Sequence, residues 1–384
     1  MHSLFAFDDA QCRSLAGAHG TPCFAYSGTV AEAGFRALRA VLPARVRIAY
    51  AVKANPNPGL LKCFAALGAS FDCASIGELE RVEALGLPPG RTFFAGPGKR
   101  SPEIQKALYM GVRIQAEGFE DLARIDAMAT RETVVNLRVH PAFDVDEGNR
   151  IIGGSGPSAF GVDEEDVPAL LERVARLNHA RIRGLHVFAA SNQRDAAKLR
   201  AIHGAVLDLA KRLHETHGLA FEQIDLGGGL GVPYTPEETP LDLKAFGQGL
   251  SNLLAEHPWF TGELILEPGR FLAGPCGSYL ARVVRIKESR GTRFAILEGG
   301  INHLIRPLLT GQPFPVKAVG KGAGAVPHTL AGPLCTSLDR LGEVRLPELA
   351  AGDLLAFGTT GAYGLNEGMT HFLSHPVPPE IWVD

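Results

Sequence analysis

The chain has 384 residues, of which 46% are hydrophobic and 21% are charged, a composition that excludes a disordered or collagen-like protein. Its 38 lysine and arginine residues nearly balance its 41 aspartate and glutamate residues and leave a net charge of -3. This balance excludes binding to nucleic acid or to an anionic membrane by electrostatic attraction alone. We therefore expect partners that are small molecules or proteins.

The cysteines of the sequence lack the close paired spacing of a zinc site, so we predict no metal site. They stand at Cys12, Cys23, Cys63, Cys73, Cys276 and Cys335. In a chain of this length they indicate reduced thiols and a cytoplasmic location. The sequence shows neither the pattern of an export signal nor a run of about 18 uninterrupted apolar residues, and we expect neither export nor membrane spanning.

From residue 46 onward, short β-branched or aromatic runs alternate with longer segments of helical periodicity. This alternation is typical of βα units around a parallel sheet, and eight such units in about 220 residues have the length of a (β/α)8 TIM barrel. Pro58 is expected near the start of one helix, and Ser75 with Glu78 has capping-box spacing at the start of the next. The predicted strands are 46–52, 70–73, 91–95, 112–116, 134–139, 182–188, 222–226 and 263–267.

Beyond residue 270 the helical periodicity is weak, and strand-like runs are separated by glycine and proline turns. This pattern predicts a C-terminal antiparallel β domain, which the first residues are expected to join because chain ends often lie close together. We place the barrel at 26–270 and the β domain at 1–25 with 271–384. The runs in question are 279–286, 293–298, 328–332 and 353–357.

Three polar residues end predicted barrel strands, which is where the catalytic side chains of such barrels project. Lys53 ends an apolar strand, where partial burial would lower its pKa as in lysines that form imines; a salt bridge at the rim is the alternative. Asp72 is placed either to orient a histidine or lysine or to cap the next helix. His186 is placed to stack on a planar cofactor, although a structural histidine gives the same pattern.

The segments after the seventh and eighth strands suit a phosphorylated cofactor. Glu267 is placed to pair with a pyridinium nitrogen, and the turn formed by Gly269 and Arg270 can bind phosphate through N–H groups and a guanidinium. Gly228 and Gly229 let the backbone approach a ligand at the usual phosphate site of such barrels. A tight βα turn and a local salt bridge are the structural alternatives.

Five separated segments, in this order and spacing, resemble the fold-type III pyridoxal-phosphate decarboxylases of ornithine, arginine and diaminopimelate, whose barrel is similar to that of alanine racemase. The resemblance covers nearly the whole chain. The segments are YAVKANPNPGLLKCFAALGASFDCASIGEL, DLGGGLGVPY, EPGRFLAGPCG, GPLCTSLDRL and GAYG.

The resemblance implies a pyridoxal 5'-phosphate enzyme in which Lys53 holds the cofactor as an imine. It implies that His186 stacks on the ring and that Glu267 contacts the ring nitrogen; alanine racemase has an arginine there, so a carboxylate favours decarboxylation over racemisation. It further implies a homodimer in which Cys335 reaches the partner's site and donates a proton, with simple packing of the thiol as the alternative. The remaining expected cofactor contacts are Asp72, Ser191, Gly228, Gly229, Gly269, Arg270 and Tyr363.

The residues expected to bind the distal end of the substrate depart from the family pattern. Thr336 stands where the ornithine and diaminopimelate enzymes carry an acidic residue for an ammonium group, although Asp339 is near enough in sequence to compensate. Arg306 matches an arginine that binds a distal carboxylate, while Thr310 replaces the tyrosine that accompanies it. A free diamino acid is therefore a poor match, because an unpaired buried charge costs several kcal/mol.

The segment 148–163, the sequence HVFA and the ending FLSHP resemble a subgroup that includes decarboxylases of aminoacyl groups held on acyl-carrier proteins, and others in siderophore or polysaccharide clusters. We accordingly predict decarboxylation of a carrier-linked or otherwise modified amino acid in secondary metabolism. An ordinary diaminopimelate, ornithine or lysine decarboxylase is the first alternative, and a catalytically silent homologue that binds a partner protein is the second. A long glycine-rich loop such as 148–163 is either a lid over the substrate or a surface insertion.

Overall fold

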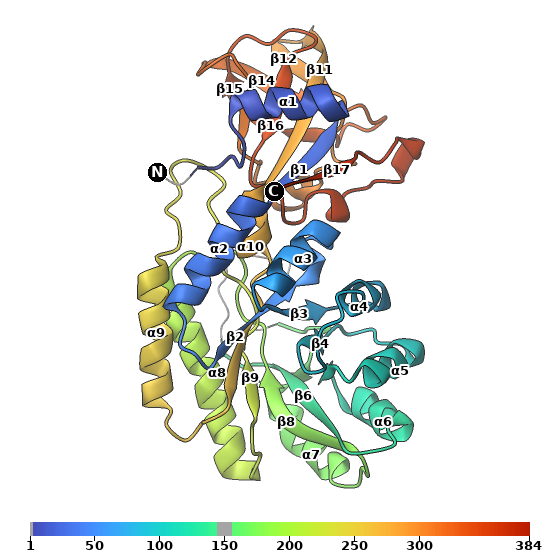
Figure 1. The fold of residues 1–384 in the computed structure, drawn as a ribbon, viewed down its shortest axis with the longest axis vertical. Helices are drawn as coiled ribbons and strands as arrows, with labels where there is room; N and C mark the ends of the chain where they lie inside the picture. The colour runs from blue at the N-terminus through green and yellow to red at the C-terminus, as the bar shows by residue number, and fades with distance from the viewer. Residues whose placement is uncertain (1–2, 144–155) are drawn as a thin grey trace. The chain divides into compact units, whose positions relative to one another are not determined.

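The computed structural model describes residues 3–143 and 156–384 (Figure 1). The described chain forms two compact units. The barrel unit comprises 35–231 and 241–269, and the β unit comprises 1–34, 232–240 and 270–384. The domain boundaries drawn from the sequence, 26–270 against 1–25 with 271–384, stay a prediction. None of the helices in the described segments is long and apolar enough to cross a bilayer.

Within the described part of the barrel unit, eight parallel strands follow the order β5-β4-β3-β2-β10-β9-β8-β6, and the pairing of β5 with β6 closes them into a barrel. The predicted TIM-barrel fold is confirmed. The short strand β7 (Val162–Asp163) adds to β6 outside this ring. The barrel strands are β2 (Val46–Ala51), β3 (Ser70–Cys73), β4 (Thr92–Phe94), β5 (Arg113–Ala116), β6 (Thr133–His140), β8 (Ala180–His186), β9 (Gln223–Asp225) and β10 (Glu263–Leu266).

Helices surround these strands, so both faces of the barrel wall are buried (Figure 1). This explains why the strands read as continuous apolar runs instead of alternating patterns. Ala49, Phe93 and Ile265 pack together as one cluster of the barrel core. The helices are α2 (Gly28–Val41), α3 (Pro58–Ala66), α4 (Ile76–Glu83), α5 (Ser101–Met110), α6 (Phe119–Met128), α7 (Val167–Val174), α8 (Ala196–His217) and α9 (Leu243–Glu256).

The two predicted helix starts are confirmed. Pro58 is the first residue of α3, where its missing N–H is not needed, and the Asn57 side chain accepts the Gly59 N–H at 2.9 Å. At α4, the Ser75 hydroxyl accepts the Glu78 N–H at 3.3 Å. The Glu78 carboxylate reaches back to the Ala74 N–H at 2.7 Å, one residue beyond the usual capping-box partner.

The β unit contains a mostly antiparallel sheet, as predicted, with parallel pairs only at β1–β17 and β12–β14 among the described strands. The N-terminal strand pairs with β11, which confirms that the first residues join this sheet. Its elements are α1 (Asp9–His19), β1 (Cys23–Ser27), α10 (Arg270–Ala273), β11 (Gly277–Ser289), β12 (Thr292–Leu297), α11 (Arg306–Thr310), β13 (Val316–Ala318), β14 (Val326–Ala331), β15 (Arg340–Leu346), β16 (Leu354–Phe357) and β17 (Glu380–Val383).

A glycine in α9 marks a close helix contact in the barrel unit. A Cβ at Gly247 would collide with the carbonyl oxygen of Val41 and lie 2.9 Å from Val41 Cβ, whereas a Cβ at Gly249 would meet Arg200 at an ordinary 3.5 Å. We expect Gly247→Ala to lower the free energy of unfolding by about 1–3 kcal/mol through overpacking. Gly249→Ala in the same helix is the matched control, expected to be neutral or stabilising by up to ~1 kcal/mol. Urea unfolding followed by circular dichroism measures both, and equal midpoints would contradict the prediction.

Candidate active site

Lys53 lies in a single 3-10 turn, Val52–Ala54, directly after β2. Its Nζ donates a hydrogen bond to Asp72 Oδ2 at 3.0 Å, and Asp72 stands beside Ala51 in the register of β2 and β3. The Asp72 side chain is 1% exposed and that of Lys53 is 34% exposed. The amine is therefore the accessible end of an ion pair with a buried acid. The salt bridge that the sequence left as one alternative is present, and the reactive amine stays a prediction.

Glu267 follows β10 and is 3% exposed. Its Oε2 lies 3.6 Å from Nε2 of His186, the last residue of β8, and its Oε1 accepts a hydrogen bond from Gln115 Nε2 at 3.0 Å. The structure thus brings Glu267 and His186 together as the sequence analysis expected. Neither ring nitrogen of His186 has a hydrogen-bond partner among the described residues, which leaves the imidazole available to a bound group.

Two further residues of this cluster were missed in the sequence. Gln115 in β5 also donates to Asp225 Oδ2 at 3.0 Å, and Asp225 is the last residue of β9. Both side chains are completely buried. Asp225 was detectable by the strand-end rule that identified Lys53, because it immediately precedes the glycine-rich turn. The amide of Gln115 carried no comparable signal.

The buried carboxyl groups differ in charge. Burial and the charge of Glu267 raise the pKa of Asp225 well above its ordinary value. Burial alone would also raise the pKa of Glu267, but His186 and Lys53 outweigh it and hold that pKa below its usual range. Burial and Glu267 raise the pKa of Asp72 against the opposing effect of Lys53. These shifts favour ionisation of Glu267 over ionisation of Asp225.

The glycine-rich turn after β9 packs against the backbone of Glu267 and the segment after β8. A Cβ at Gly228 would lie 2.6 Å from the Glu267 carbonyl oxygen, and one at Gly229 would lie 2.5 Å from the Ala190 carbonyl oxygen. Gly229 also has a φ of 98°, in the region that glycine favours. Glycines are needed here for close approach as well as for the turn.

Two other expected cofactor contacts lie next to these segments. Ser191 belongs to the loop after β8, whose Gln193 N–H donates to the Gly229 carbonyl at 2.8 Å. Gly269 borders the Lys53 turn, because a Cβ there would lie 2.8 Å from Ala54 Cβ. Lys53, Asp72, His186, Ser191, Gly228, Gly229, Glu267 and Gly269 all belong to the barrel unit.

A cluster of guanidinium groups and phenols occupies the β unit. Arg270 Nη1 donates to the Tyr234 hydroxyl at 2.7 Å, and its Cζ lies 4.8 Å from the Tyr363 ring centroid. Arg306 lies 4.7 Å from the Tyr234 centroid and donates through Nη2 to Gln312 Oε1 at 2.8 Å. Burial lowers the pKa of Arg306. Two guanidinium groups around one phenol suit an anionic ligand.

The segment between β14 and β15 contains Cys335, Thr336 and Asp339. Cys335 is exposed, and the Thr336 hydroxyl accepts the Leu338 N–H at 3.2 Å. Asp339 is buried, and its two oxygens accept the N–H groups of Ile301 and Leu334, each at 2.7 Å. Burial raises the pKa of Asp339. Its carboxylate therefore fixes the local backbone, and its predicted role toward a substrate stays a prediction.

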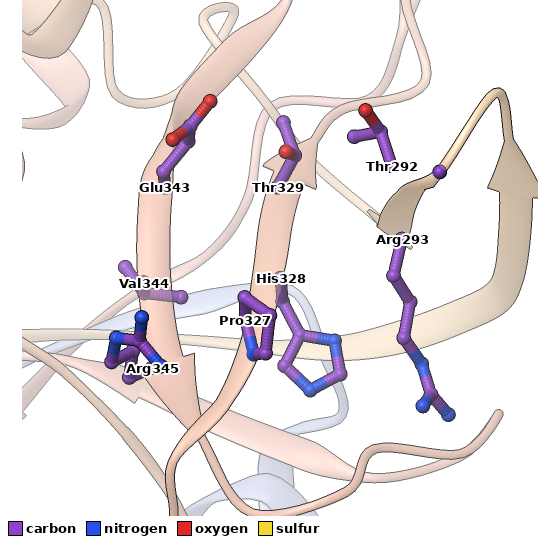
Figure 2. A pocket seen from close by; sticks show the side chains of 9 residues that line it. Thr292, Arg293, Pro327, His328, Thr329, Glu343, Val344 and Arg345 are labelled. Atoms are coloured by element: carbon purple, nitrogen blue, oxygen red, sulfur yellow. The ribbon is translucent and has the colours of Figure 1, made fainter.

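A separate hollow of about 440 Å³ lies on strands β12, β14 and β15. Figure 2 shows Arg293 and Arg345 on either side of His328. Each of these side chains has one local partner: Arg293 pairs with Glu348 at 2.8 Å, Arg345 donates to the Ala325 carbonyl, and His328 contacts the Pro347 carbonyl, while Arg293 Nε and His328 Nδ1 have no hydrogen-bond partner among the described residues. This hollow lacks the combination of amine and carboxylates found in the barrel.

The expected loop at 148–163 is described only in part, since 148–155 lie outside the described residues. Its C-terminal end is anchored at the barrel. Glu117 accepts the Gly161 N–H at 2.7 Å and pairs with Arg138 at 3.1 Å, and Arg138 lies 4.5 Å from the Phe160 ring centroid. Its predicted lid function stays a prediction.

The barrel residues fit pyridoxal phosphate. An accessible amine, an imidazole with two buried nitrogens lacking hydrogen bonds, and a buried carboxylate match the aldehyde, ring face and ring nitrogen of that cofactor. Lys53, His186 and Glu267 would hold these three parts. The glycine turn provides backbone close to the same carboxylate.

Comparison with known proteins agrees with this fit. The pyridoxal-binding domain of the pyridoxal-dependent decarboxylases matches residues 29–274. The chain is 32% identical to L-glutamyl-(BtrI acyl-carrier protein) decarboxylase of Niallia circulans, over 97% of this chain and 91% of that protein. It is also 32% identical to diaminopimelate decarboxylase of Zymomonas mobilis, over 98% of this chain and 90% of that protein.

Solved structures show the same similarity. Helicobacter pylori diaminopimelate decarboxylase in complex with L-lysine superposes with a TM-score of 0.88 at 27% identity, covering 97% of this chain and 94% of that one. The lysine/ornithine decarboxylase of Vibrio vulnificus with putrescine gives 0.84 at 28% identity, covering 98% of both chains.

Lys53 can be tested directly as the attachment point of the cofactor. Lys53→Ala and Lys53→Arg are both expected to abolish the visible absorption of lysine-bound pyridoxal phosphate and all CO2 release, because neither side chain can bond to the aldehyde. Lys53→Arg keeps a cation beside Asp72 and so controls for the ion pair; the exposed Lys62→Ala is the neutral control. Borohydride reduction and peptide mapping should place the label on residue 53 in the wild type. A label elsewhere, or retained turnover in Lys53→Arg, would refute the assignment.

Proposed function

This chain belongs to the pyridoxal-dependent decarboxylase family and is a pyridoxal-phosphate-dependent amino-acid decarboxylase; from that premise we propose that its substrate is an amino acid tethered or modified at its side chain, such as an aminoacyl group on a carrier protein. A second proposal concerns the catalytic roles of its residues. A third is that two copies of the chain form the active enzyme.

Pyridoxal phosphate, when bound, supplies the electron sink that accepts the bonding electrons left by departing CO2. Lys53 would hold the cofactor through its amine, which Asp72 orients by a hydrogen bond at 3.0 Å. Glu267 keeps a proton on the ring nitrogen, because a carboxylate held as an anion in a buried site stabilises a facing cation. His186 packs on the ring and fixes its plane. The glycine turn would offer backbone to the phosphate, and the family resemblance assigns Arg270 and Tyr363 to the same group.

Cys335 is the proposed donor of the proton that replaces the carboxyl group on the α-carbon. Its exposure supports a role toward a second subunit, since an exposed thiol on the β unit is free to enter a neighbouring site. Exposed apolar side chains in nearby segments support a protein interface on the same unit. They include Leu308, Leu309, Leu338, Met369, Phe372 and Leu373.

One observation carries the substrate proposal: the Asp339 carboxylate is already hydrogen-bonded to the backbone of its own chain. Both of its oxygens are satisfied by backbone N–H groups, and Thr336 contributes a hydroxyl and no charge. Thr310 is likewise occupied: its hydroxyl donates to the Arg306 carbonyl at 2.9 Å and accepts the Gln312 N–H at 3.2 Å. A free distal ammonium would thus lack the acidic partner expected in this segment.

Arg306 supports a distal group that accepts hydrogen bonds. Its side chain is buried, and its Nε has no partner among the described residues. The charge of Glu367, which belongs to the same unit, opposes the lowering of the Arg306 pKa by burial. A buried guanidinium N–H suits the carbonyl or carboxylate of a side chain, and the carrier-protein decarboxylase of Niallia circulans is among the relatives of this chain.

An ordinary diaminopimelate decarboxylase remains the second candidate, because several relatives carry that name and diaminopimelate has a distal carboxylate that Arg306 would also bind. The catalytically silent alternative loses its support, since the chain belongs to a decarboxylase family and keeps Lys53 and Glu267 in one cluster.

Substrate choice is measured by CO2 release from free diamino acids and from side-chain thioesters of amino acids on pantetheine and on a carrier protein. The tethered substrates are expected to have a kcat/KM about 100-fold higher, corresponding to the penalty of one poorly paired ammonium. Thr336→Asp should raise kcat/KM for free diamino acids about tenfold, while the uncharged Thr336→Asn should not. Efficient turnover of a free diamino acid by the wild type would refute the proposal.

Sharing of sites between subunits is tested by complementation. Cys335→Ala is expected to lower kcat about 100-fold through loss of a proton donor, and Lys53→Ala to be inactive. Equal amounts of the two chains, refolded together, should regain about 25% of wild-type activity, because half of random dimers are mixed and each mixed dimer keeps one complete site. Recovery no greater than the mean of the two parent variants would contradict a shared site.

A further inference from the structure

Three buried polar groups from three separate parts of the barrel wall converge on one point. Gln115 extends from β5, Asp225 ends β9 and Glu267 follows β10. The Gln115 Nε2 donates to Asp225 Oδ2 and to Glu267 Oε1, both at 3.0 Å. Because its two N–H bonds face two carboxyl groups, the orientation of the amide is fixed by its neighbours.

The glycine turn links the same two acids a second time. Asp225 Oδ1 accepts the Gly227 N–H at 2.9 Å, and the Gly227 carbonyl accepts the Glu267 N–H at 2.8 Å. Glu267 is therefore held through its backbone by the turn and through its side chain by Gln115. Asp225 takes part in both connections.

The charges around the pair determine which acid keeps a proton. Polar atoms of Asp225, Glu267 and His186 lie within 4.8 Å of one another, and Asp72 and Lys53 act on the same site. Two buried carboxyl groups at this separation cannot both ionise without a large energetic penalty. His186 and Lys53 stabilise a charge on Glu267, so the proton belongs to Asp225.

We propose that Gln115 and Asp225 are positioning residues for the decarboxylase, and that Asp225 acts as a neutral carboxylic acid that holds Glu267 ionised and oriented toward the ring nitrogen of the cofactor. This proposal rests on the role proposed above for Glu267. Glu267 can stabilise a protonated ring nitrogen only as an anion with a fixed direction. A neutral donor at 225 supports that anion, whereas a second anion would compete with it for the ring proton.

The test compares variants that remove or keep each hydrogen bond. Gln115→Met removes both N–H donors at nearly constant volume, and Asp225→Leu removes the acid. Each is expected to lower kcat and to weaken pyridoxal phosphate binding by about tenfold or more, as expected for loss of a buried hydrogen bond to a charged group. Gln223→Met is the matched control, because Gln223 is a buried amide two residues before Asp225 that bonds Glu263 instead, at 3.1 Å. It should leave both quantities unchanged.

Asp225→Asn distinguishes a neutral acid from an anion. Asparagine is uncharged and keeps one of the two acceptor oxygens that Asp225 offers to the Gly227 and Gln115 N–H groups, so kcat at neutral pH should stay within about tenfold of the wild type, and above that of Asp225→Leu, if residue 225 acts without charge. If Asp225 functions as a carboxylate, Asp225→Asn will be as impaired as Asp225→Leu, and the proposal is overturned.

Stability of the apoprotein provides a readout that is independent of turnover. In the wild type, Asp225 keeps its proton in the folded state above about pH 4, where the unfolded carboxyl has lost it, so unfolding releases a proton. Folded stability therefore falls as pH rises above about 4 and Asp225→Asn does not share this loss. The urea midpoint of Asp225→Asn relative to wild type should rise with pH; a flat or falling difference contradicts the proposal.

The variant Glu267→Gln tests the role of Glu267 separately from the positioning roles of Gln115 and Asp225. If that variant matches the wild type in kcat and cofactor binding, the proposed role of Glu267 fails. If Glu267→Gln is impaired while Gln115→Met behaves like Gln223→Met, Glu267 keeps its role and the positioning proposal alone is refuted.

Discussion

The barrel of this protein buries more carboxyl groups than it can keep ionised, and this constraint determines the chemistry of the cluster. One buried site of low dielectric constant contains the carboxyl groups of Asp72, Asp225 and Glu267. Among the described residues, one lysine and one histidine act on this site. Lys53 pairs with Asp72, and His186 faces Glu267. Asp225 has no such cation opposite it among these residues, and burial beside Glu267 raises its pKa well above its ordinary value. The distribution of charge follows from which partner each strand places opposite each acid.

Closure of the barrel makes this distribution possible. Gln115 and Glu267 are far apart in sequence, yet both belong to one ring of parallel strands and their side chains meet at 3.0 Å. The glycine turn then brings the backbone of Gly228 against that of Glu267, closer than any side chain permits. Fixed strands and a close turn position the acid without a mobile segment, which is the preorganisation that charge stabilisation requires.

The sequence predicted the barrel well because its strands are apolar runs separated by capped helices, and each of the eight predicted strands corresponds to an observed one. It also singled out Lys53, Asp72, His186 and Glu267, which the structure brings into one cluster, since an ionisable residue at the end of an apolar strand is costly and therefore informative. The short strands β13 and β17, and β15 with its exposed charged residues, lacked such a signal. Asp225 also ends its strand and was overlooked, whereas Gln115 gave no such signal, because its importance arises from side-chain neighbours that sequence spacing does not reveal.

In the proposed enzyme, decarboxylation and recognition of the distal end of the substrate depend on different parts of the chain. The barrel cluster acts on the amino, carboxyl and α-carbon groups that every amino-acid substrate shares, and its residues match the family pattern. Thr310, Thr336 and Asp339, all in the β unit, depart from that pattern or are occupied by local hydrogen bonds. Loss of an acidic partner penalises a free ammonium without disturbing the carboxylates of the barrel, because these groups belong to separate hydrogen-bond networks. Substrate choice can therefore change in this fold without altering the carboxyl groups of the barrel cluster.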